Sequence, residues 1–179
     1  MRIYFIGSHS TGKTTLARYT SNLKKLPLLT EVARTILAEK ELHVDSLRAD
    51  LNVVNDYQKE VFLRQLAEEK KYPSFVSDRS FDCLAYTAQH STILNEVLKT
   101  KELTDYVNSL KDPNVKLFFV RPSKATLKND GVREHIVWDN IVAIDAMIKF
   151  MVEMWKIPCI QVSTDSMQER VRLIESIIS

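Results

Sequence analysis

Glycine is scarce in this chain, which has 179 residues and only 3 glycines. Average usage would put glycine at roughly 7% of residues. The scarcity excludes collagen-like sequences and Gly-rich linkers, and it argues against most turn-dense all-β folds. The few glycines that remain are therefore informative, and they stand at Gly7, Gly12 and Gly131.

Cysteine, net charge and uninterrupted apolar runs are also limited. Cys83 and Cys159 lack metal-ligand spacing, so we expect two reduced, buried thiols in a cytoplasmic protein. A net charge of +2 does not indicate a general nucleic-acid-binding surface. The most apolar long stretch, 141–152, is interrupted by Asp145 and Lys149. We therefore expect no membrane-spanning helix.

What is present is the balance of a globular domain, with 45% hydrophobic and 27% charged residues. No repeat, low-complexity tract or linker divides the chain, so we expect one domain over residues 1–179. Five short apolar runs, most of them beside a proline, have little strict alternation, which is typical of strands buried on both faces. These runs are Ile3–Ile6, Leu28–Thr30, Ser74–Ser77, Lys116–Val120 and Ile157–Val162.

Segments with helical periodicity separate the apolar runs. Strands that alternate with helices predict an α/β fold, in which a parallel sheet is covered on both faces. Ligands bind such sheets beyond the carboxyl ends of the strands, so we expect the chemistry there. The expected helices are Lys13–Leu26, Glu31–Leu42, Ser46–Lys71, Ser80–Lys111, Arg133–Lys156 and Ser166–Ile178.

The first predicted strand runs directly into a phosphate-binding loop of the Walker A pattern G-x-x-x-x-G-K-[ST]. Its glycines let successive backbone N–H groups turn toward phosphate oxygens, and the helix that follows presents its positive end to the same anion. The lysine can reach the β- and γ-phosphates of ATP, and the hydroxyl after it can bind Mg²⁺. The loop consists of Gly7, Ser8, His9, Ser10, Thr11, Gly12, Lys13, Thr14 and Thr15.

Several classes of phosphate-loop protein are excluded by missing motifs. The D-x-x-G and N-K-x-D motifs of guanine-nucleotide switches are absent. The apolar run 118–120 ends in Arg121 and not in the Asp-Glu pair of motor and AAA-type ATPases. A small-molecule kinase, which needs an acceptor pocket and a cationic lid, is the interpretation that remains favoured.

An acid and a base follow the third predicted strand. Asp78 can bind Mg²⁺ or its water shell, and Arg79 can contact an acceptor phosphate or the transferred phosphoryl group. The alternative is that Asp78 caps the following helix and that Arg79 lies on the surface.

A second cationic segment, at about 121–133, is our candidate for the lid. Arg133 is the best candidate to stabilise charge on the γ-phosphoryl group, and Arg121 and Lys128 are weaker ones. An ordinary solvated basic loop is the alternative.

Taken together, these motifs resemble the AAA-like group of P-loop nucleoside kinases, which includes ribosylnicotinamide kinase domains. The Asp-Arg pair is also similar to that of thymidylate kinases and deoxynucleoside kinases. The resemblance implies a three-layer α/β/α fold with a five-stranded parallel sheet of order 2-3-1-4-5. It is carried by Gly7–Thr15, Glu31–Arg34, Asp78–Ser80 with Asp82 and Tyr86, and Asp130–Arg133.

The acceptor side is predicted from the second strand and the helices after it. Glu31 follows that strand, and the resemblance implies that it orients or deprotonates the acceptor hydroxyl; Arg34 lies on the same helix face. The alternative for this pair is an ion pair in the first helical turn. Gln58 falls on an apolar stripe with Tyr57 beside it, and the resemblance makes it a base reader, although it could equally meet water.

Asp82 and Tyr86 share a helix face and could line the same pocket. We expect His9 to contact a phosphate or a neighbouring loop.

The resulting prediction is an ATP- and Mg²⁺-dependent kinase whose acceptor is a hydroxyl or phosphate of a nucleoside or nucleoside monophosphate. Two alternatives stay open: a kinase that acts on a modified base or an end in nucleic acid, and a regulatory ATP-binding module without phosphotransfer. The oligomeric state is open as well, with a homodimer as one option.

Overall fold

A computed structural model describes residues 1–30, 32–40, 50–125 and 138–179. Its core is a 5-stranded sheet of order β2-β3-β1-β4-β5, and every neighbouring pair of strands is parallel. This confirms the predicted α/β fold and the order 2-3-1-4-5. The strands are β1 (Arg2–Ile6), β2 (Leu28–Leu29), β3 (Phe75–Ser77), β4 (Val115–Val120) and β5 (Ile160–Val162).

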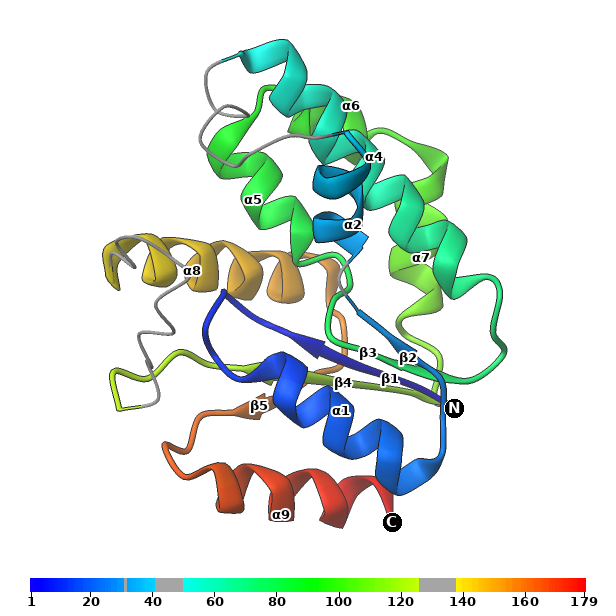
Figure 1. Cartoon of the computed structure of the whole chain (residues 1–179), viewed down its shortest axis with the longest axis vertical. Helices are drawn as coiled ribbons and strands as arrows, with labels where there is room; N and C mark the ends of the chain where they lie inside the picture. The colour runs from blue at the N-terminus through cyan, green and yellow to red at the C-terminus, as the bar shows by residue number, and fades with distance from the viewer. Residues whose placement is uncertain (31, 41–49, 126–137) are drawn as a thin grey trace.

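Helices cover both faces of the sheet in three layers. Helices α1 and α9 lie on one face, and the other helices lie on the opposite face (Figure 1). The described helices are α1 (Lys13–Lys24), α2 (Val32–Glu39), α4 (Leu51–Glu69), α5 (Cys83–His90), α6 (Leu94–Leu98), α7 (Lys101–Ser109), α8 (Trp138–Trp155) and α9 (Met167–Ile178).

Strand β1 shows why the strands lack alternation of apolar and polar residues. Its side chains point alternately to the two faces. Ile3 and Phe5 pack in the cluster beneath α1 and α9, whereas Tyr4 and Ile6 pack in the larger cluster on the opposite face. All four are fully buried, so both faces demand apolar side chains.

The predicted helix over 80–111 is wrong, because the structure contains α5, α6 and α7 in this segment. Helix α5 ends where Ser91 adopts an extended conformation, and α7 begins after Thr100, which is also extended. The Thr100 hydroxyl accepts a hydrogen bond from the N–H of Leu103 and so caps α7. The breaks are therefore made by local capping without glycine or proline.

Two smaller expectations also differ from the structure. Asp50 is extended and caps α4, so this helix begins at Leu51 and not at residue 46. Cys159, which we expected to be a buried thiol, is partly exposed, whereas Cys83 is buried as expected. Within the described ranges, no helix combines the length and hydropathy that crossing a membrane requires.

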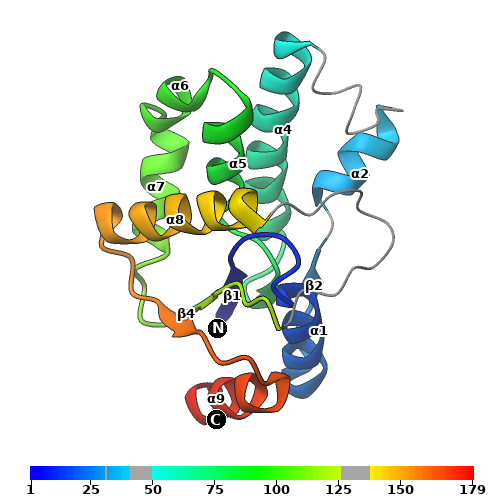
Figure 2. The same cartoon turned by 90° about the vertical axis from the view of Figure 1, so that its left-hand side faces the viewer.

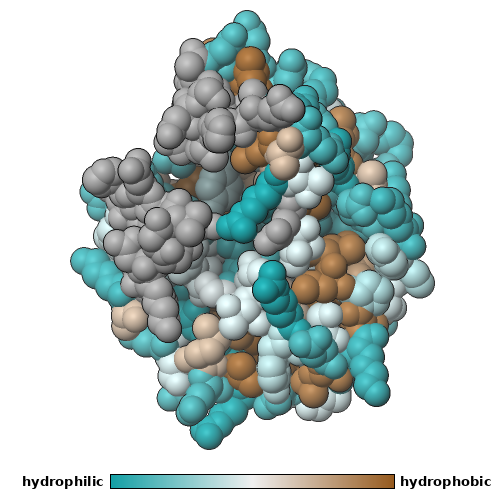
Figure 3. Space-filling view, in the orientation of Figure 1, coloured by the Kyte–Doolittle hydropathy of each residue, from teal (hydrophilic) through white to brown (hydrophobic). Residues whose placement is uncertain are grey.

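The carboxyl ends of the strands lie together at one edge of the sheet. Figure 2 looks onto this edge and shows the β1–α1 loop between α8 on one side and α1 and α9 on the other. On the face seen in Figure 3, the surface of the described residues is mainly hydrophilic, with smaller hydrophobic patches. The sequence predicts that ligands bind at this edge, beyond the carboxyl ends of the strands.

Candidate active site

The loop between β1 and α1 depends on two glycines with positive φ angles, Gly7 at 147° and Gly12 at 91°. Ser10 between them also adopts a left-handed conformation, with φ 59°. A Cβ atom on Gly7 would lie 2.4 Å from the carbonyl oxygen of Val120, which is closer than side chains tolerate. Strand β4 therefore packs directly against the start of this loop.

The lysine of the loop lies within its curve. Lys13 Nζ donates hydrogen bonds to the carbonyl oxygens of Gly7 and Ser8 at 2.8 and 2.6 Å. Ser8 Oγ is buried and has no hydrogen-bond partner among the described residues. A flexible ammonium and a buried hydroxyl at the same loop are polar groups that an anionic ligand can engage.

Thr14, the next residue, connects the loop to the end of β3. Its Oγ1 donates a hydrogen bond of 2.5 Å to Oδ2 of Asp78. A hydroxyl and a carboxylate are the hard oxygen ligands that Mg²⁺ takes, usually together with waters and substrate phosphates. Within the described ranges, no three acidic, histidine or cysteine residues gather as a group that could hold a metal ion.

Asp82 lies behind the loop and not on an open surface. It is only 3% exposed. Its Oδ2 accepts a hydrogen bond from the N–H of Gly7 at 3.3 Å, and its Oδ1 accepts one from the N–H of Ser80 at 2.7 Å. Burial raises the pKa of Asp82, and the positive charges of Lys13 and Arg79 oppose this rise. This carboxylate therefore braces the phosphate loop against the loop after β3.

Arg79, in the loop after β3, is partly buried. Burial acts to lower the pKa of its guanidinium, but the neighbouring acidic groups, Asp82 foremost and Asp78 among them, outweigh burial and raise it. The group therefore stays positively charged beside the phosphate loop.

Helix α5 also reaches the loop through Tyr86. The Tyr86 hydroxyl lies 3.3 Å from Nδ1 of His9, and the two rings are tilted against each other with centroids 6.2 Å apart. His9 thus contacts helix α5, and its predicted contact with a phosphate or a neighbouring loop stays a prediction.

The predicted acceptor residues lie on the helices opposite α1 and α9. Tyr57 and Gln58 are both buried in α4. The Tyr57 hydroxyl donates to the carbonyl oxygen of Ala33 in α2 at 3.2 Å, and Gln58 Oε1 accepts from Thr87 Oγ1 of α5 at 3.3 Å. Arg34 is exposed on α2. These contacts join α2, α4 and α5 into one wall.

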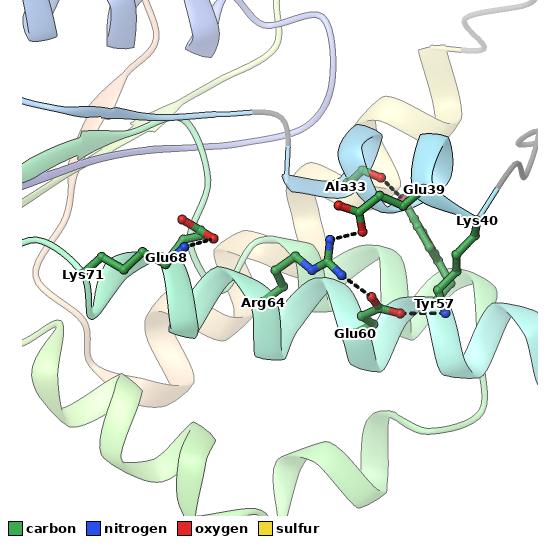
Figure 4. A network of polar contacts seen from close by, with 8 residues as sticks. All are labelled: Ala33, Glu39, Lys40, Tyr57, Glu60, Arg64, Glu68 and Lys71. Carbon is green, nitrogen blue, oxygen red and sulfur yellow. Dashed lines mark hydrogen bonds and ion pairs between the residues drawn. The ribbon is translucent and has the colours of Figure 1, made fainter.

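Ion pairs strengthen the same contact between α2 and α4 (Figure 4). Arg64 pairs with Glu39 and with Glu60, and Lys40 pairs with Glu60 at 2.6 Å. Because these groups are substantially exposed, we assign them a role in orienting α2 and only a small one in stability.

Three predicted residues, Glu31, Lys128 and Arg133, lie outside the described residues, as does most of the expected lid. Arg121, a weaker candidate to stabilise charge on the γ-phosphoryl group, forms hydrogen bonds with other parts of the protein. Its guanidinium donates to Asp145 of α8 at 2.6–3.1 Å and to Gln161 Oε1 at 3.1 Å. It links β4 to α8 and β5.

Sequence reasoning missed a buried polar cluster around Glu69 of α4. Its carboxylate accepts hydrogen bonds from Tyr4 at 2.6 Å, Tyr106 at 2.7 Å and Gln65 at 2.9 Å. The Tyr106 hydroxyl also lies 2.8 Å from Ser80 Oγ, so the cluster supports the loop that carries Arg79. The available signal was the position of Glu69 four residues after Gln65 on the buried face of α4.

Arg170 of α9 was missed as well. It is 0% exposed and donates to the carbonyl oxygen of Thr11 in the phosphate loop at 2.7 Å. The signal was its spacing, because Arg170, Ile174 and Ile178 recur every four residues and form the buried face of α9.

The phosphate loop at the carboxyl edge of a parallel, three-layer sheet places this protein in the phosphate-loop class of α/β proteins. A family model described as an AAA domain matches residues 2–170, and the chain belongs to this family. No curated protein matches the chain by sequence.

Solved structures share this fold at low sequence identity. NadR in complex with NR has a TM-score of 0.73 at 16% identity; the match covers 98% of this chain and 50% of NadR. Deoxyadenosine kinase from M. mycoides with bound dCTP has a TM-score of 0.67 at 13% identity, with 99% and 98% covered. Shikimate kinase from Acinetobacter baumannii with shikimate has a TM-score of 0.57 at 12% identity, with 99% and 90% covered. These likenesses confirm a fold that small-molecule kinases use.

Proposed function

We propose that this protein is an ATP-dependent kinase that transfers the γ-phosphoryl group to a hydroxyl or phosphate of a nucleoside or nucleoside monophosphate. The observation that supports this most is the 2.5 Å hydrogen bond between Thr14 and Asp78, beside Lys13 of the phosphate loop. It joins a phosphate-binding loop and a candidate Mg²⁺ ligand at one point. Two of the similar structures are described as deoxyadenosine kinase and as NadR in complex with NR, and these descriptions favour a nucleoside as the acceptor.

In this proposal each residue has a defined task. Lys13 exchanges its loop carbonyls for the β- and γ-phosphates. Mg²⁺, held by Thr14 and Asp78, would neutralise phosphate charge. Arg79 stabilises charge on the transferred group or binds an acceptor phosphate. Glu31, which lies outside the described residues, orients or deprotonates the acceptor hydroxyl.

The remaining predicted residues complete the proposal. Arg133, on the lid outside the described residues, adds positive charge at the γ-phosphoryl group. Arg34, Tyr57 and Gln58 belong to the wall formed by α2, α4 and α5, on the acceptor side, and Tyr86 of the same wall contacts His9 of the phosphate loop. The buried Asp82 acts from behind the loop, without direct contact to the acceptor.

The experiment is an ATP-consumption panel with deoxynucleosides, nucleoside monophosphates, ribosylnicotinamide and single-stranded DNA. We expect one nucleoside or nucleotide class to stimulate turnover. Stimulation by DNA alone would favour the nucleic-acid alternative. MgATP binding without stimulation by any acceptor would contradict the kinase and favour a regulatory module.

Two variants sharpen the result. Lys13→Ala should lower turnover by at least about 100-fold, because it removes a charge that acts on the transferred group. Lys24→Ala on the same helix is the matched control. Asp78→Asn should raise the Mg²⁺ concentration needed for half-maximal ATP binding, which calorimetry measures without turnover. Unchanged Mg²⁺ dependence would contradict the role of Asp78.

A further inference from the structure

Three loops at the carboxyl edge of the sheet converge on one buried guanidinium. Arg170 Nη1 donates to the carbonyl oxygen of Thr11 at 2.7 Å. Its Nε donates to the carbonyl oxygen of Thr164 at 2.6 Å, and its Nη2 to that of Arg121 at 3.3 Å. These carbonyls belong to the phosphate loop, the β5–α9 loop and the segment after β4. A single side chain therefore bridges all three.

Packing alone does not explain an arginine at this buried position of α9. Burying a cation is costly unless its hydrogen bonds are satisfied, and the same face of α9 carries isoleucines at 174 and 178. An aliphatic residue would fill position 170 at lower cost. The planar fork of arginine can serve several carbonyls at once, which the single ammonium of lysine cannot do in the same geometry.

The bond to Thr11 has a direct consequence for the phosphate loop. In a planar trans peptide, the C=O of one residue and the N–H of the next point in opposite directions. Because the Thr11 carbonyl points to Arg170, the N–H of Gly12 points away from α9. Gly12 also packs against α9, since a Cβ there would lie 3.0 Å from Cε of Met167 and 3.9 Å from Nη1 of Arg170.

We propose that Arg170 is a positioning residue for the phosphate donor. Its guanidinium orients the Thr11–Gly12 peptide and holds the phosphate loop to the loops after β4 and β5. The inference rests on the proposed function, because it takes the phosphate loop as the binding site for MgATP. Arg170 contacts no reacting atom in this proposal and acts through the backbone of the loop.

The test compares Arg170→Ala and Arg170→Lys with Arg172→Ala, a matched control at an exposed position of the same helix. Calorimetry measures the Kd for MgATP at a temperature where thermal unfolding shows each variant to be folded. We expect both Arg170 variants to bind about 10- to 100-fold more weakly, and the control to bind like the wild type. Millimolar guanidinium chloride should restore part of the affinity of Arg170→Ala, whereas equal sodium chloride should not.

The outcomes separate this inference from the proposed function. Folded Arg170 variants with wild-type affinity, alongside a Lys13→Ala variant that loses binding, would overturn the role of Arg170 and leave the donor site intact. A lower melting temperature with unchanged Kd would show a merely structural role and also overturn it. A wild-type protein that fails to bind MgATP would overturn both. If Arg170→Ala does not fold, Arg170→Lys decides.

Discussion

At the scale of single residues, the two glycines of the phosphate loop make different demands. Gly7→Ala should lower the free energy of unfolding by about 2–4 kcal/mol, because its Cβ would strike a backbone atom of β4 as well as strain φ. Gly12→Ala should cost less, since its nearest contact is the flexible end of Met167. Urea denaturation of both variants measures the difference, and equal losses would contradict the argument.

Glu69 gives the protein a specific pH dependence. Burial raises the pKa of this carboxyl, against the hydrogen bonds of Tyr4, Gln65 and Tyr106 and the charge of Arg2, which lower it. The folded state therefore keeps the proton to higher pH than the unfolded state does. Stability should fall as pH rises from the ordinary glutamate pKa of about 4.3 to the raised value.

The measurement is the difference in unfolding free energy between wild type and Glu69→Gln across this pH range. We expect the wild type to lose stability relative to the variant as pH rises. Glu102→Gln, at an exposed position of α7, is the control. Parallel curves for wild type and Glu69→Gln would show that the carboxyl titrates alike in both states.

These residues also mark what the sequence can predict. The phosphate loop is contiguous, so its motif was visible directly. The partners of Glu69 and Arg170 come from distant segments, such as Tyr4 and Thr11. Spacing indicates that a charged residue lies on a buried face, but it does not say which carbonyl or hydroxyl meets it.

At the scale of elements, the end of one helix can be tested through Thr100. Thr100→Ala should cost about 1 kcal/mol, because the hydroxyl caps α7 through the N–H of Leu103. Thr104→Ala, at an exposed position within the same helix, is the control and should change stability by less than about 0.5 kcal/mol. Chemical denaturation measures both, and equal effects would contradict the capping role.

Strands β1, β3 and β4 could be predicted because both of their faces are buried, which leaves a clear apolar signature. The segment 80–111 was misread for the opposite reason. Its helical periodicity continues across Ser91 and Thr100, and no glycine or proline marks the breaks. Short helices that change direction by capping alone leave little trace in periodicity.

At the scale of the molecule, Asp145 joins α8 to the sheet through Arg121, which also bonds to β5. Asp145→Ala should cost about 3 kcal/mol, because it leaves a largely buried guanidinium without its charged partner. Asp139→Ala, exposed at the start of the same helix, is the control. Thermal unfolding measures both variants, and a loss no larger than the control's would contradict this link.

The order of the strands has a consequence for synthesis. The phosphate loop follows β1, yet its hydrogen-bond partners lie 64 residues away at Asp78, 75 at Asp82 and 159 at Arg170. Contacts between such distant segments form late in folding. A nascent chain therefore carries its phosphate loop early and completes the contacts of that loop only when helix α9 has left the ribosome.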